Sequence, residues 1–496
     1  METDADICLF LEGTYPYVTG GVSNWAHDLI KDHKDFTFTL VCLLPKNQEI
    51  KYRFALPENV VGLRNIYLQE IPPSSKTLSE KEQIAFFHDL EPLIMAIHDN
   101  GKISDLKAIL ELIHRYEGSL DEHVLLESKE AFNMMVRIYL MVMGNSSFLN
   151  FFWSFRSLIG GFLSVMLSPL PKAKVYHTFC TGFSGLFLAR AFAETGNPCL
   201  TTEHGIYTNE RRIEIASAQW LDDMRSQNLT IKPNKFEKDI KDYWTDTFLS
   251  YSKLCYEASY KIVTLFEGNT DFQIADGADP EKLLIIPNGV DYDKFSQVQK
   301  NKDHPPTIAL IARVVHIKDI KTFIRTVGIL KDSIPDIQTY IIGPTDEDHE
   351  YYEECIQLIQ QQELEETITL TGKVDIMDYL PIIDVIVLTS LSEGQPLTLL
   401  EGGAAGIPLV ATNVGACREI ISGRRGDRGE GGFVTPLANP YAISKAIQNL
   451  LENKKLYDLY SETIQKRVAK YYHRNLQVEA YHELYSKVLH QVECAT

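Results

Sequence analysis

Two glutamates eight positions apart lie in a window whose flanking residues indicate where they are placed. Glu393 follows the apolar run Val385–Leu388, so it falls in the loop at the carboxyl end of a buried strand, where ligands bind in open α/β sheets. Pro396 suits the first turn of a helix, which places Glu401 about 7 to 8 Å along the helix axis at ~1.5 Å per residue. Two such carboxylates can bind different parts of one extended ligand, and the helix N-terminus between them favours a phosphate. The arrangement suits a nucleotide sugar, although a helix-capping acid and a solvated acid would show the same spacing.

An arginine and a lysine stand five positions apart at the end of another predicted strand, Thr307–Ala312. Arg313 and Lys318 can therefore converge on a diphosphate, and they can stabilise the charge that develops on a leaving nucleotide without a metal ion. For either residue alone, a surface cation is the open alternative.

Two features of the amino-terminal half belong to the same kind of site. His204 follows the predicted strand Cys199–Thr202, which places it at a carboxyl edge facing an interdomain cleft. Gly20 and Gly21 end the first loop, where they let the backbone approach a ligand at the start of the next helix. A structurally satisfied histidine and a plain tight turn are the alternatives.

The elements that must position these residues alternate between strand and helix patterns. The strands expected are Ile7–Leu11, Phe38–Leu44, Val175–Phe179, Cys199–Thr202, Ile262–Leu265, Thr307–Ala312, Thr339–Ile342, Thr367–Leu370, Val385–Leu388 and Pro408–Ala411. We predict an α/β protein with two Rossmann-like, doubly wound domains facing a cleft, residues 1–298 and 299–470. A helical insertion is expected at about 78–170, and a helical tail at 471–496 that crosses back to the first domain.

Composition limits the classes of function. At 496 residues the chain is too long for one ordinary core. The 48 Lys and Arg against 67 Asp and Glu give a formal charge of -19, which argues against nucleic acid as a partner. The eight cysteines are scattered, as expected for reduced thiols. Because the acidic start Met1–Asp6 lacks the basic region of a signal peptide, we expect a cytoplasmic protein.

The most apolar stretch, Phe132–Leu170, is interrupted by charges such as Arg137 and Arg156, so we do not expect a membrane span. Its aromatic residues leave two possibilities open: a buried helical pair, or contact with a membrane surface or membrane partner. These aromatic residues are Phe151, Phe152, Trp153 and Phe155.

The motifs together resemble the retaining glycosyltransferases of family 4, which have the GT-B fold. The resemblance is carried by Arg313 with Lys318, by Pro287–Asp291, and by Glu393 with seven residues before Glu401. More closely, several segments look like the glycosyltransferases of Pel exopolysaccharide synthesis. These are Leu11–Tyr17 with Gly20–Ser23, the helical insertion, Phe266–Asn269 and Ser392–Pro396.

The resemblance implies a role for each matching residue. Arg313 and Lys318 would hold the donor diphosphate, Glu393 would face the donor sugar, and Glu401 the ribose hydroxyls. His204 would lie beside the reacting centre, with the Gly20–Gly21 loop on the phosphate and acceptor side. The resemblance also assigns Asn288, Gly394, Gln395, Pro396 and Leu397 to the donor site, with Glu12, Thr14 and Tyr15 as further acceptor-side candidates.

Two positions depart from the family pattern. Ala312 stands where many members have glycine, and Gln395–Pro396 stand where many have Phe-Gly. Because proline has no backbone N–H, one common hydrogen-bond donor to the ligand is missing at Pro396.

The activity implied is transfer, with retention and without a metal, of a sugar from a nucleotide diphosphate sugar such as UDP-glucose to a growing exopolysaccharide. The substrate nucleotide would be UDP, with no other cofactor. The protein would associate peripherally with inner-membrane proteins of polysaccharide synthesis and export. Two alternatives stay open: a nucleotide-sugar epimerase of the same architecture, and a non-catalytic nucleotide-binding subunit.

Overall fold

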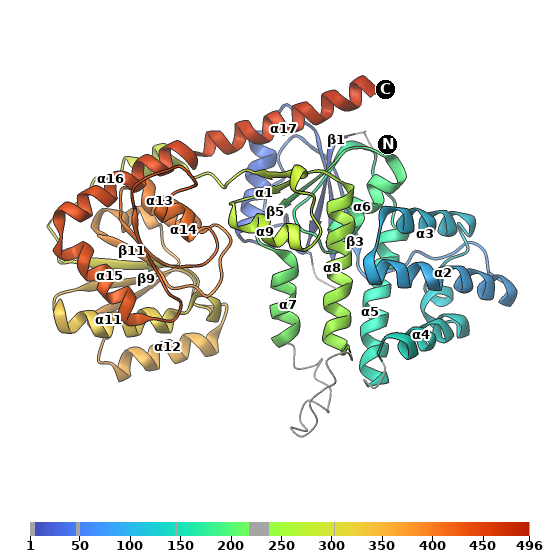
Figure 1. Cartoon of the computed structure of the whole chain (residues 1–496), viewed down its shortest axis with the longest axis horizontal. Helices are drawn as coiled ribbons and strands as arrows, with labels where there is room; N and C mark the ends of the chain where they lie inside the picture. Colours follow the sequence, from blue (N-terminus) through green and yellow to red (C-terminus); the bar gives the residue numbers. More distant parts are fainter. Residues whose placement is uncertain (1–4, 46–49, 144–146, 218–237, 302, 496) are drawn as a thin grey trace. The chain divides into compact units, whose positions relative to one another are not determined.

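The computed structural model (Figure 1) describes residues 5–45, 50–143, 147–217, 238–301 and 303–495. Residues 1–4, which contribute to the expectation about a signal peptide, lie outside the described residues. The chain divides into two compact units. The first comprises Met1–Thr264, Asn269–Leu284 and His482–Thr496, and the second Leu265–Gly268 and Ile285–Tyr481.

The first unit is built on a seven-stranded sheet in the order β3-β2-β1-β4-β5-β6-β7. The strands are β1 (Ala5–Glu12), β2 (Phe38–Leu44), β3 (Val60–Tyr67), β4 (Ala173–Thr178), β5 (Cys199–Glu203), β6 (Ser259–Thr264) and β7 (Leu283–Ile285). Strands β1 to β6 pair in parallel. Continuous apolar runs such as β2, buried along its whole length, are typical of parallel strands covered on both faces. The helices that follow them are α1 (Gly21–Asp32), α6 (Phe183–Thr195), α7 (Tyr207–Ser217), α8 (Ile240–Ala258) and α9 (Gly268–Ala275).

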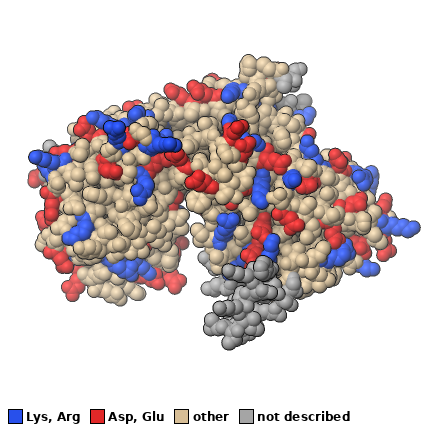
Figure 2. Space-filling model, in the orientation of Figure 1, with Lys and Arg blue, Asp and Glu red and all other residues tan. Residues whose placement is uncertain are grey.

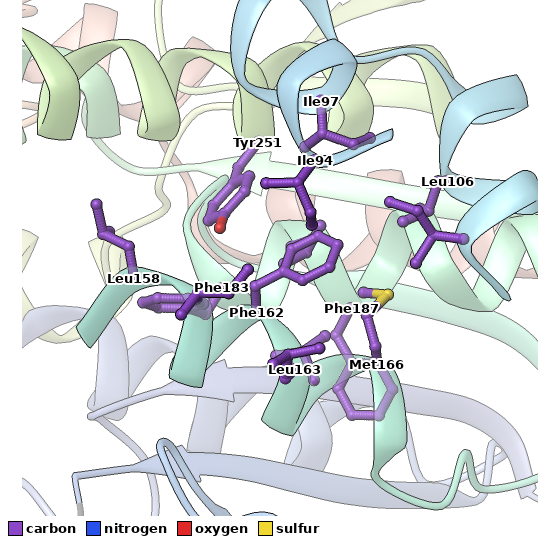
Figure 3. Packing of buried hydrophobic residues seen from close by; sticks show 14 of the residues in the cluster. Ile94, Ile97, Leu106, Leu158, Phe162, Leu163, Met166, Phe183, Phe187 and Tyr251 are labelled. Atoms are coloured by element: carbon purple, nitrogen blue, oxygen red, sulfur yellow. The ribbon is translucent and has the colours of Figure 1, made fainter. Parts of the chain in front are cut away.

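A helical insertion separates β3 from β4. It contains α2 (Glu80–Asn100), α3 (Ile103–Arg115), a π-helical turn at His123–Glu127, α4 (Lys129–Val142) and α5 (Phe148–Leu167). Ser79 and Glu82 form a reciprocal capping box that starts α2. Apolar side chains of α2, α3 and α5 pack with those of α6 and α8 in one core (Figure 3).

Helix α5 is the one helix among the described residues that is long and apolar enough to cross a membrane. Because 61% of its apolar window is buried, it fits the core helix of a globular unit, which passes the same test. Phe151 and Phe155 are buried, whereas Trp153 is 60% exposed. The burial of Phe151 and Phe155 agrees with the first possibility, a buried helical pair, whereas Trp153 is not part of that core.

The second unit has a six-stranded parallel sheet in the order β10-β9-β8-β11-β12-β13. The strands are β8 (Thr307–Ile311), β9 (Gln338–Ile342), β10 (Ile368–Gly372), β11 (Val385–Leu388), β12 (Leu409–Thr412) and β13 (Gly432–Thr435). Its helices are α10 (Tyr292–Ser296), α11 (Ile320–Ser333), α12 (His349–Gln361), α13 (Leu397–Ala404), α14 (Cys417–Ser422), α15 (Pro440–Glu452) and α16 (Lys454–Tyr471). Two separate apolar clusters contain buried residues from this sheet and the helices around it.

The last helix, α17 (Arg474–Ala495), begins in the second unit, and its residues from His482 onward belong to the first. Within the first unit, Tyr485 is fully buried, and its hydroxyl lies 2.7 Å from Nδ1 of the buried His177 on β4. Nε2 of His177 lies 2.9 Å from the hydroxyl of Thr202 on β5. The later part of α17 thus packs in the core of the first unit through Tyr485.

The prediction of two Rossmann-like α/β domains with a helical insertion and a helical carboxyl end is confirmed. Three strands that the sequence patterns did not reveal, β3, β7 and β13, extend the two sheets at their edges. On the face seen in Figure 2, the described Lys and Arg side chains are interspersed with Asp and Glu.

Candidate functional site

The loops after β8 and β11 bring two of the predicted site residues into contact, because these strands are neighbours in the sheet. Lys318 Nζ lies 2.6 Å from Glu393 Oε1, and the side chains are only 17% and 11% exposed. The hydroxyl of Ser390 donates to the same carboxylate oxygen at 2.5 Å. A shielded, charge-assisted pair therefore stands at the carboxyl edge of the sheet.

The two loops are also joined through their backbones. The Thr389 hydroxyl donates to the carbonyl oxygens of Lys318 and Asp319, and the Leu391 N–H donates to the carbonyl of Ile317. Asp319, in the left-handed region at φ 46°, caps α11. These bonds fix the position of Lys318 before any ligand binds.

Arg313 does not join this pair in the structure. Its Nη1 lies 2.5 Å from Oε2 of Glu347, and both side chains are about half exposed, at 53% and 43%. Next to it, His316 Nδ1 lies 2.8 Å from Asp348 Oδ2. The sequence interpretation missed Glu347 and Asp348, although an acidic run soon after β9 must lie near the end of β8, its neighbour in the sheet.

Gln395, in the loop between β11 and α13, joins this loop to the segment before α10. Its Oε1 accepts from the Asn288 N–H at 2.7 Å. Because a backbone N–H can only donate, this bond determines which way the amide faces and directs Nε2 elsewhere. Gln395 Nε2 and Asn288 Oδ1 are both buried, with no hydrogen-bond partner among the residues that the structure describes. A buried polar atom without a partner costs about 1–3 kcal/mol, which a ligand can recover.

The remaining candidates for the donor site lie on helix α13 or just before it. Pro396 is its N-cap and Leu397 its first residue, so the backbone N–H groups of the first turn begin at Leu397. Burial raises the pKa of Glu401 to about 7, opposed by the charge of Lys294 on α10. Gly394 accepts a hydrogen bond from the Ala416 N–H at 2.8 Å.

The other predicted site residues belong to the first unit. His204 follows β5, with its ring edge-on to Trp25 of α1 at 4.5 Å between centroids. Burial lowers the pKa of His204 to about 4, so the imidazole is neutral at physiological pH. Its Nε2 is buried without a hydrogen-bond partner in the described part of the chain. Gly20 precedes α1 and Gly21 begins it, and no described atom would lie within 4 Å of a Cβ added at either.

Each unit of the chain is thus a parallel sheet flanked by helices, with polar residues gathered where its strands end. Solved glycosyltransferases match this architecture. Sucrose-phosphate synthase from Thermosynechococcus elongatus superimposes with a TM-score of 0.60 at 15% identity, covering 99% of this chain and 100% of that one. Anabaena HepE, solved in complex with UDP, gives 0.59 at 12% identity, covering 97% and 100%. The fold is the GT-B fold.

Two family profiles divide the sequence between them. Residues 5–281 match the domain of unknown function DUF3492, and residues 291–467 match the family described as glycosyl transferases group 1. The chain belongs to the DUF3492 family.

Curated relatives share parts of this chain. An N,N'-diacetylbacillosaminyl-diphospho-undecaprenol alpha-1,3-N-acetylgalactosaminyltransferase of Campylobacter jejuni is 26% identical over 49% of this chain and 64% of its own length. A D-inositol 3-phosphate glycosyltransferase of Pseudarthrobacter chlorophenolicus is 30% identical over 30% of this chain and 39% of its own. The chain thus spans less than two thirds of the length of these relatives.

Proposed function

We propose that this chain is a retaining glycosyltransferase that transfers a sugar from a UDP-sugar to a growing exopolysaccharide without a metal ion. The observation that carries the proposal is the contact between Lys318 and Glu393 at the carboxyl edge of the second sheet. The match of residues 291–467 to glycosyl transferases group 1 supports it. HepE was solved with UDP and with UDP-glucose, which supports the choice of nucleotide.

In this proposal the second unit binds the donor. Lys318 and Arg313 neutralise the diphosphate and the charge that develops on it as the sugar leaves. Arg313 is available because its exposed ion pair with Glu347 is worth only about 0–1 kcal/mol, less than a charge-assisted contact with phosphate. Glu393 binds the sugar and Glu401 the ribose hydroxyls.

The loop around α13 completes the donor site. The amide of Gln395 and the side-chain oxygen of Asn288 supply a donor and an acceptor that have no described partner. Gly394, Pro396 and Leu397 present the backbone of the helix start to the phosphates.

The first unit supplies the acceptor side in this proposal. His204, neutral because burial lowers its pKa, binds beside the transferred sugar without adding a charge. Gly20 and Gly21 leave open space at the start of α1 for the phosphate and the acceptor. Retention follows from attack on the face from which the phosphate leaves, assisted by that phosphate.

We also propose the Pel polysaccharide as the polymer, on the strength of the motif resemblance, and a cytoplasmic location at the inner membrane with peripheral protein partners. The structure describes all eight cysteines and none of them forms a disulfide bond, which supports a reducing compartment.

Calorimetric titration with UDP, GDP and ADP tests the donor site. UDP should bind more tightly than the other two. Lys318→Met should weaken UDP binding about tenfold or more, since a charge-assisted hydrogen bond is worth about 1.5–3 kcal/mol. Lys321→Met is the matched control, because Lys321 is only three residues away and pairs with Glu354. Equal losses in both variants would refute the site assignment.

The epimerase alternative is tested with the donor alone. NMR of UDP-glucose incubated with the protein should show slow release of glucose and UDP, with the sugar's configuration at carbon 1 retained. Interconversion of UDP-glucose with UDP-galactose would identify an epimerase and overturn the proposal.

A further inference from the structure

A groove of about 760 Å³ runs between α2 and α4, two helices of the insertion that lie side by side (Figure 1). On α2 its lining extends from Ile84 to Asp99, a length of about 22 Å at ~1.5 Å per residue. At ~30 Å³ per water molecule the volume equals roughly 25 waters. The groove is therefore too long and too large to be filled by a few ordered waters.

More than half of the residues that line the groove are apolar. They are Ile84, Phe87, Pro92, Met95, Ala96 and Met141. Phe87 forms the floor and is 1% exposed, whereas Ile84 and Met141 are 49% and 60% exposed. Methionine side chains are flexible and adapt to apolar partners of different shapes. Large apolar side chains left exposed around a concave surface are typical of an interaction site.

The charged side chains of the groove are mostly acidic. Glu91, Asp99 and Glu130 line it together with one cation, Arg137. Arg137 already has a partner, because its Nη2 lies 2.6 Å from Glu91 Oε2. Asp99 and Glu130 form no ion pair with any residue that the structure describes. A ligand that fills the groove therefore needs Lys or Arg to match the excess of negative charge.

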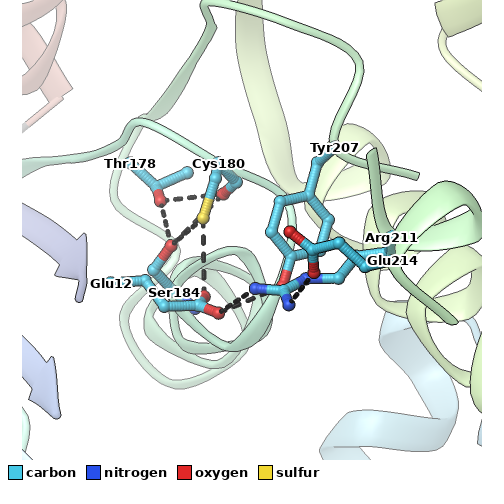
Figure 4. A network of polar contacts seen from close by, with 7 residues as sticks. All are labelled: Glu12, Thr178, Cys180, Ser184, Tyr207, Arg211 and Glu214. Carbon is cyan, nitrogen blue, oxygen red and sulfur yellow. Dashed lines mark hydrogen bonds and ion pairs between the residues drawn. The ribbon is translucent and has the colours of Figure 1, made fainter. Parts of the chain in front are cut away.

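A carboxylate in the core of the same unit has a different environment (Figure 4). Glu12 lines a smaller cavity of about 200 Å³. It accepts hydrogen bonds from the Tyr207 hydroxyl and the Ser184 N–H, both at 3.0 Å, and Arg211 Nη2 lies 3.9 Å away. The protein itself thus compensates the charge of Glu12, whereas the charge of Asp99 is left to solvent or to a ligand.

An α-helix fits this groove better than a membrane or a second copy of the chain. A helix of about 15 residues spans ~22 Å, and helices bind apolar grooves through side chains spaced at i, i+3 or i+4, and i+7. A membrane surface does not fill a concave groove, and Asp99 and Glu130 would repel anionic lipid headgroups. A second copy carries the same formal charge of -19, which opposes pairing.

We propose that the groove between α2 and α4 binds an amphipathic helix of a partner protein. The apolar face of that helix contacts Phe87, Met95 and Met141, and Lys or Arg residues beside this face pair with Asp99 and Glu130. The inference rests on the proposed function only for the existence of peripheral protein partners, and it adds the surface and the chemistry that recognise one of them.

A displayed library of helical peptides of about 15 residues, screened against the full chain, tests the groove. The apolar face is randomised, and the flanking positions carry Lys and Arg in one half of the library and Asp and Glu in the other half. Binders should come from the basic half. In fluorescence anisotropy each should bind at least about tenfold more tightly than a scrambled peptide of the same composition, which controls for non-specific attraction to the acidic protein.

Variants of the groove locate the bound peptide. Ile84→Glu and Met141→Glu each place a charge against the apolar face of the peptide and should weaken binding at least about tenfold. Asp99→Asn combined with Glu130→Gln should weaken it at least about threefold. Leu140→Glu is the matched control, because Leu140 precedes Met141 and is 68% exposed but does not line the groove. Because Ile84 and Met141 are largely exposed, both variants should unfold at the temperature of the parent in circular dichroism.

Three results would overturn the inference. The first is that no binder emerges, or that binders come from the acidic half of the library. The second is that the selected peptides bind Ile84→Glu and Met141→Glu as tightly as they bind the parent. The third is that Met141→Glu, but not Leu140→Glu, abolishes binding to vesicles of phosphatidylglycerol and phosphatidylethanolamine, or abolishes self-association in sedimentation, because the groove then binds a membrane or a second copy.

UDP calorimetry separates this inference from the proposed function. Met141→Glu should bind UDP as tightly as the parent does, since it changes only the helical insertion. Absent UDP binding in the parent would refute the transferase proposal, whereas intact UDP binding without any peptide binding would refute the groove alone.

Discussion

Glu203, the residue before His204, should make the stability of the first unit depend on pH. The side chain is 1% exposed at the end of β5, and its Oε2 accepts from the Tyr256 hydroxyl at 2.6 Å and from Gln273 Nε2 at 2.8 Å. Burial is the largest influence and raises the pKa of Glu203 from 4.5 to about 7, against the opposing effect of these hydrogen bonds. The folded state therefore keeps a proton that the unfolded state releases.

The linkage between proton binding and folding gives the sign and size of this pH dependence. Between pH 4.5 and 7 the folded state binds more protons than the unfolded state, so the free energy of unfolding falls as pH rises. The shift of about 2.5 units corresponds to about 3 kcal/mol at ~1.4 kcal/mol per unit, fully present below pH 4.5 and lost as pH passes about 7. About 2 kcal/mol of this falls between pH 5.5 and 7.

The test is urea unfolding of the parent and Glu203→Gln from pH 5.5 to 7.5, followed by tryptophan fluorescence. The tryptophans that the structure describes, Trp25, Trp153 and Trp244, lie in the first unit, so their signal reports on that unit. Because glutamine does not titrate, the stability of the variant relative to the parent should rise by about 2 kcal/mol from pH 5.5 to 7. Glu117→Gln removes an exposed carboxylate of the same unit. The free energy of unfolding of this variant relative to the parent should not change with pH.

A flat difference for Glu203→Gln, or one that falls with pH, would refute this reasoning. It would mean that the hydrogen bonds from Tyr256 and Gln273 outweigh burial and keep the carboxylate ionised.

Three further perturbations have predictable effects. Lys318→Met leaves the shielded carboxylate of Glu393 without its cation and should lower the stability of the second unit by about 3 kcal/mol. Adding Glu393→Gln should recover part of this loss. Unfolding followed by circular dichroism measures both changes. Gly415→Ala, at φ 50°, places a Cβ against the carbonyl oxygens of Gly394 and Glu393. It should therefore displace that loop and weaken UDP binding in calorimetry about tenfold or more. Tyr485→Phe removes the hydrogen bond to His177 and should lower the stability of the first unit by about 1 kcal/mol, measured by tryptophan fluorescence.

Two controls accompany these variants. Gly426→Ala also has a positive φ, at 90°, but no described atom lies within 4 Å of the added Cβ. It should therefore cost about 1 kcal/mol for backbone strain while leaving UDP binding unchanged, and equal loss of binding in Gly415→Ala and Gly426→Ala would contradict the steric explanation. Lys321→Met should cost at most about 1 kcal/mol, since that ion pair is more exposed.

Local patterns in the sequence determine where the charged candidate residues of the second unit lie. The run Val385–Leu388 forms a strand at the predicted bounds, because a continuous apolar segment of that length suits a strand buried on both faces. Glu393 then has to lie at the carboxyl edge of the sheet, near Lys318 once their two strands are adjacent. Strand β3 escaped notice because its residues are mostly half-buried at the sheet edge and give no such run.

Only the tertiary structure decides which partners and environments these side chains have. Arg313 and Lys318 are close in sequence, yet one pairs with Glu347 and the other with Glu393, because the order of the strands determines which loops are neighbours. The elevated pKa of Glu203 and the cavity around Glu12 depend on side chains brought together from distant segments. Residue type and spacing determine which groups reach a sheet edge, whereas burial, charge and hydrogen bonding there depend on the packing of the whole unit.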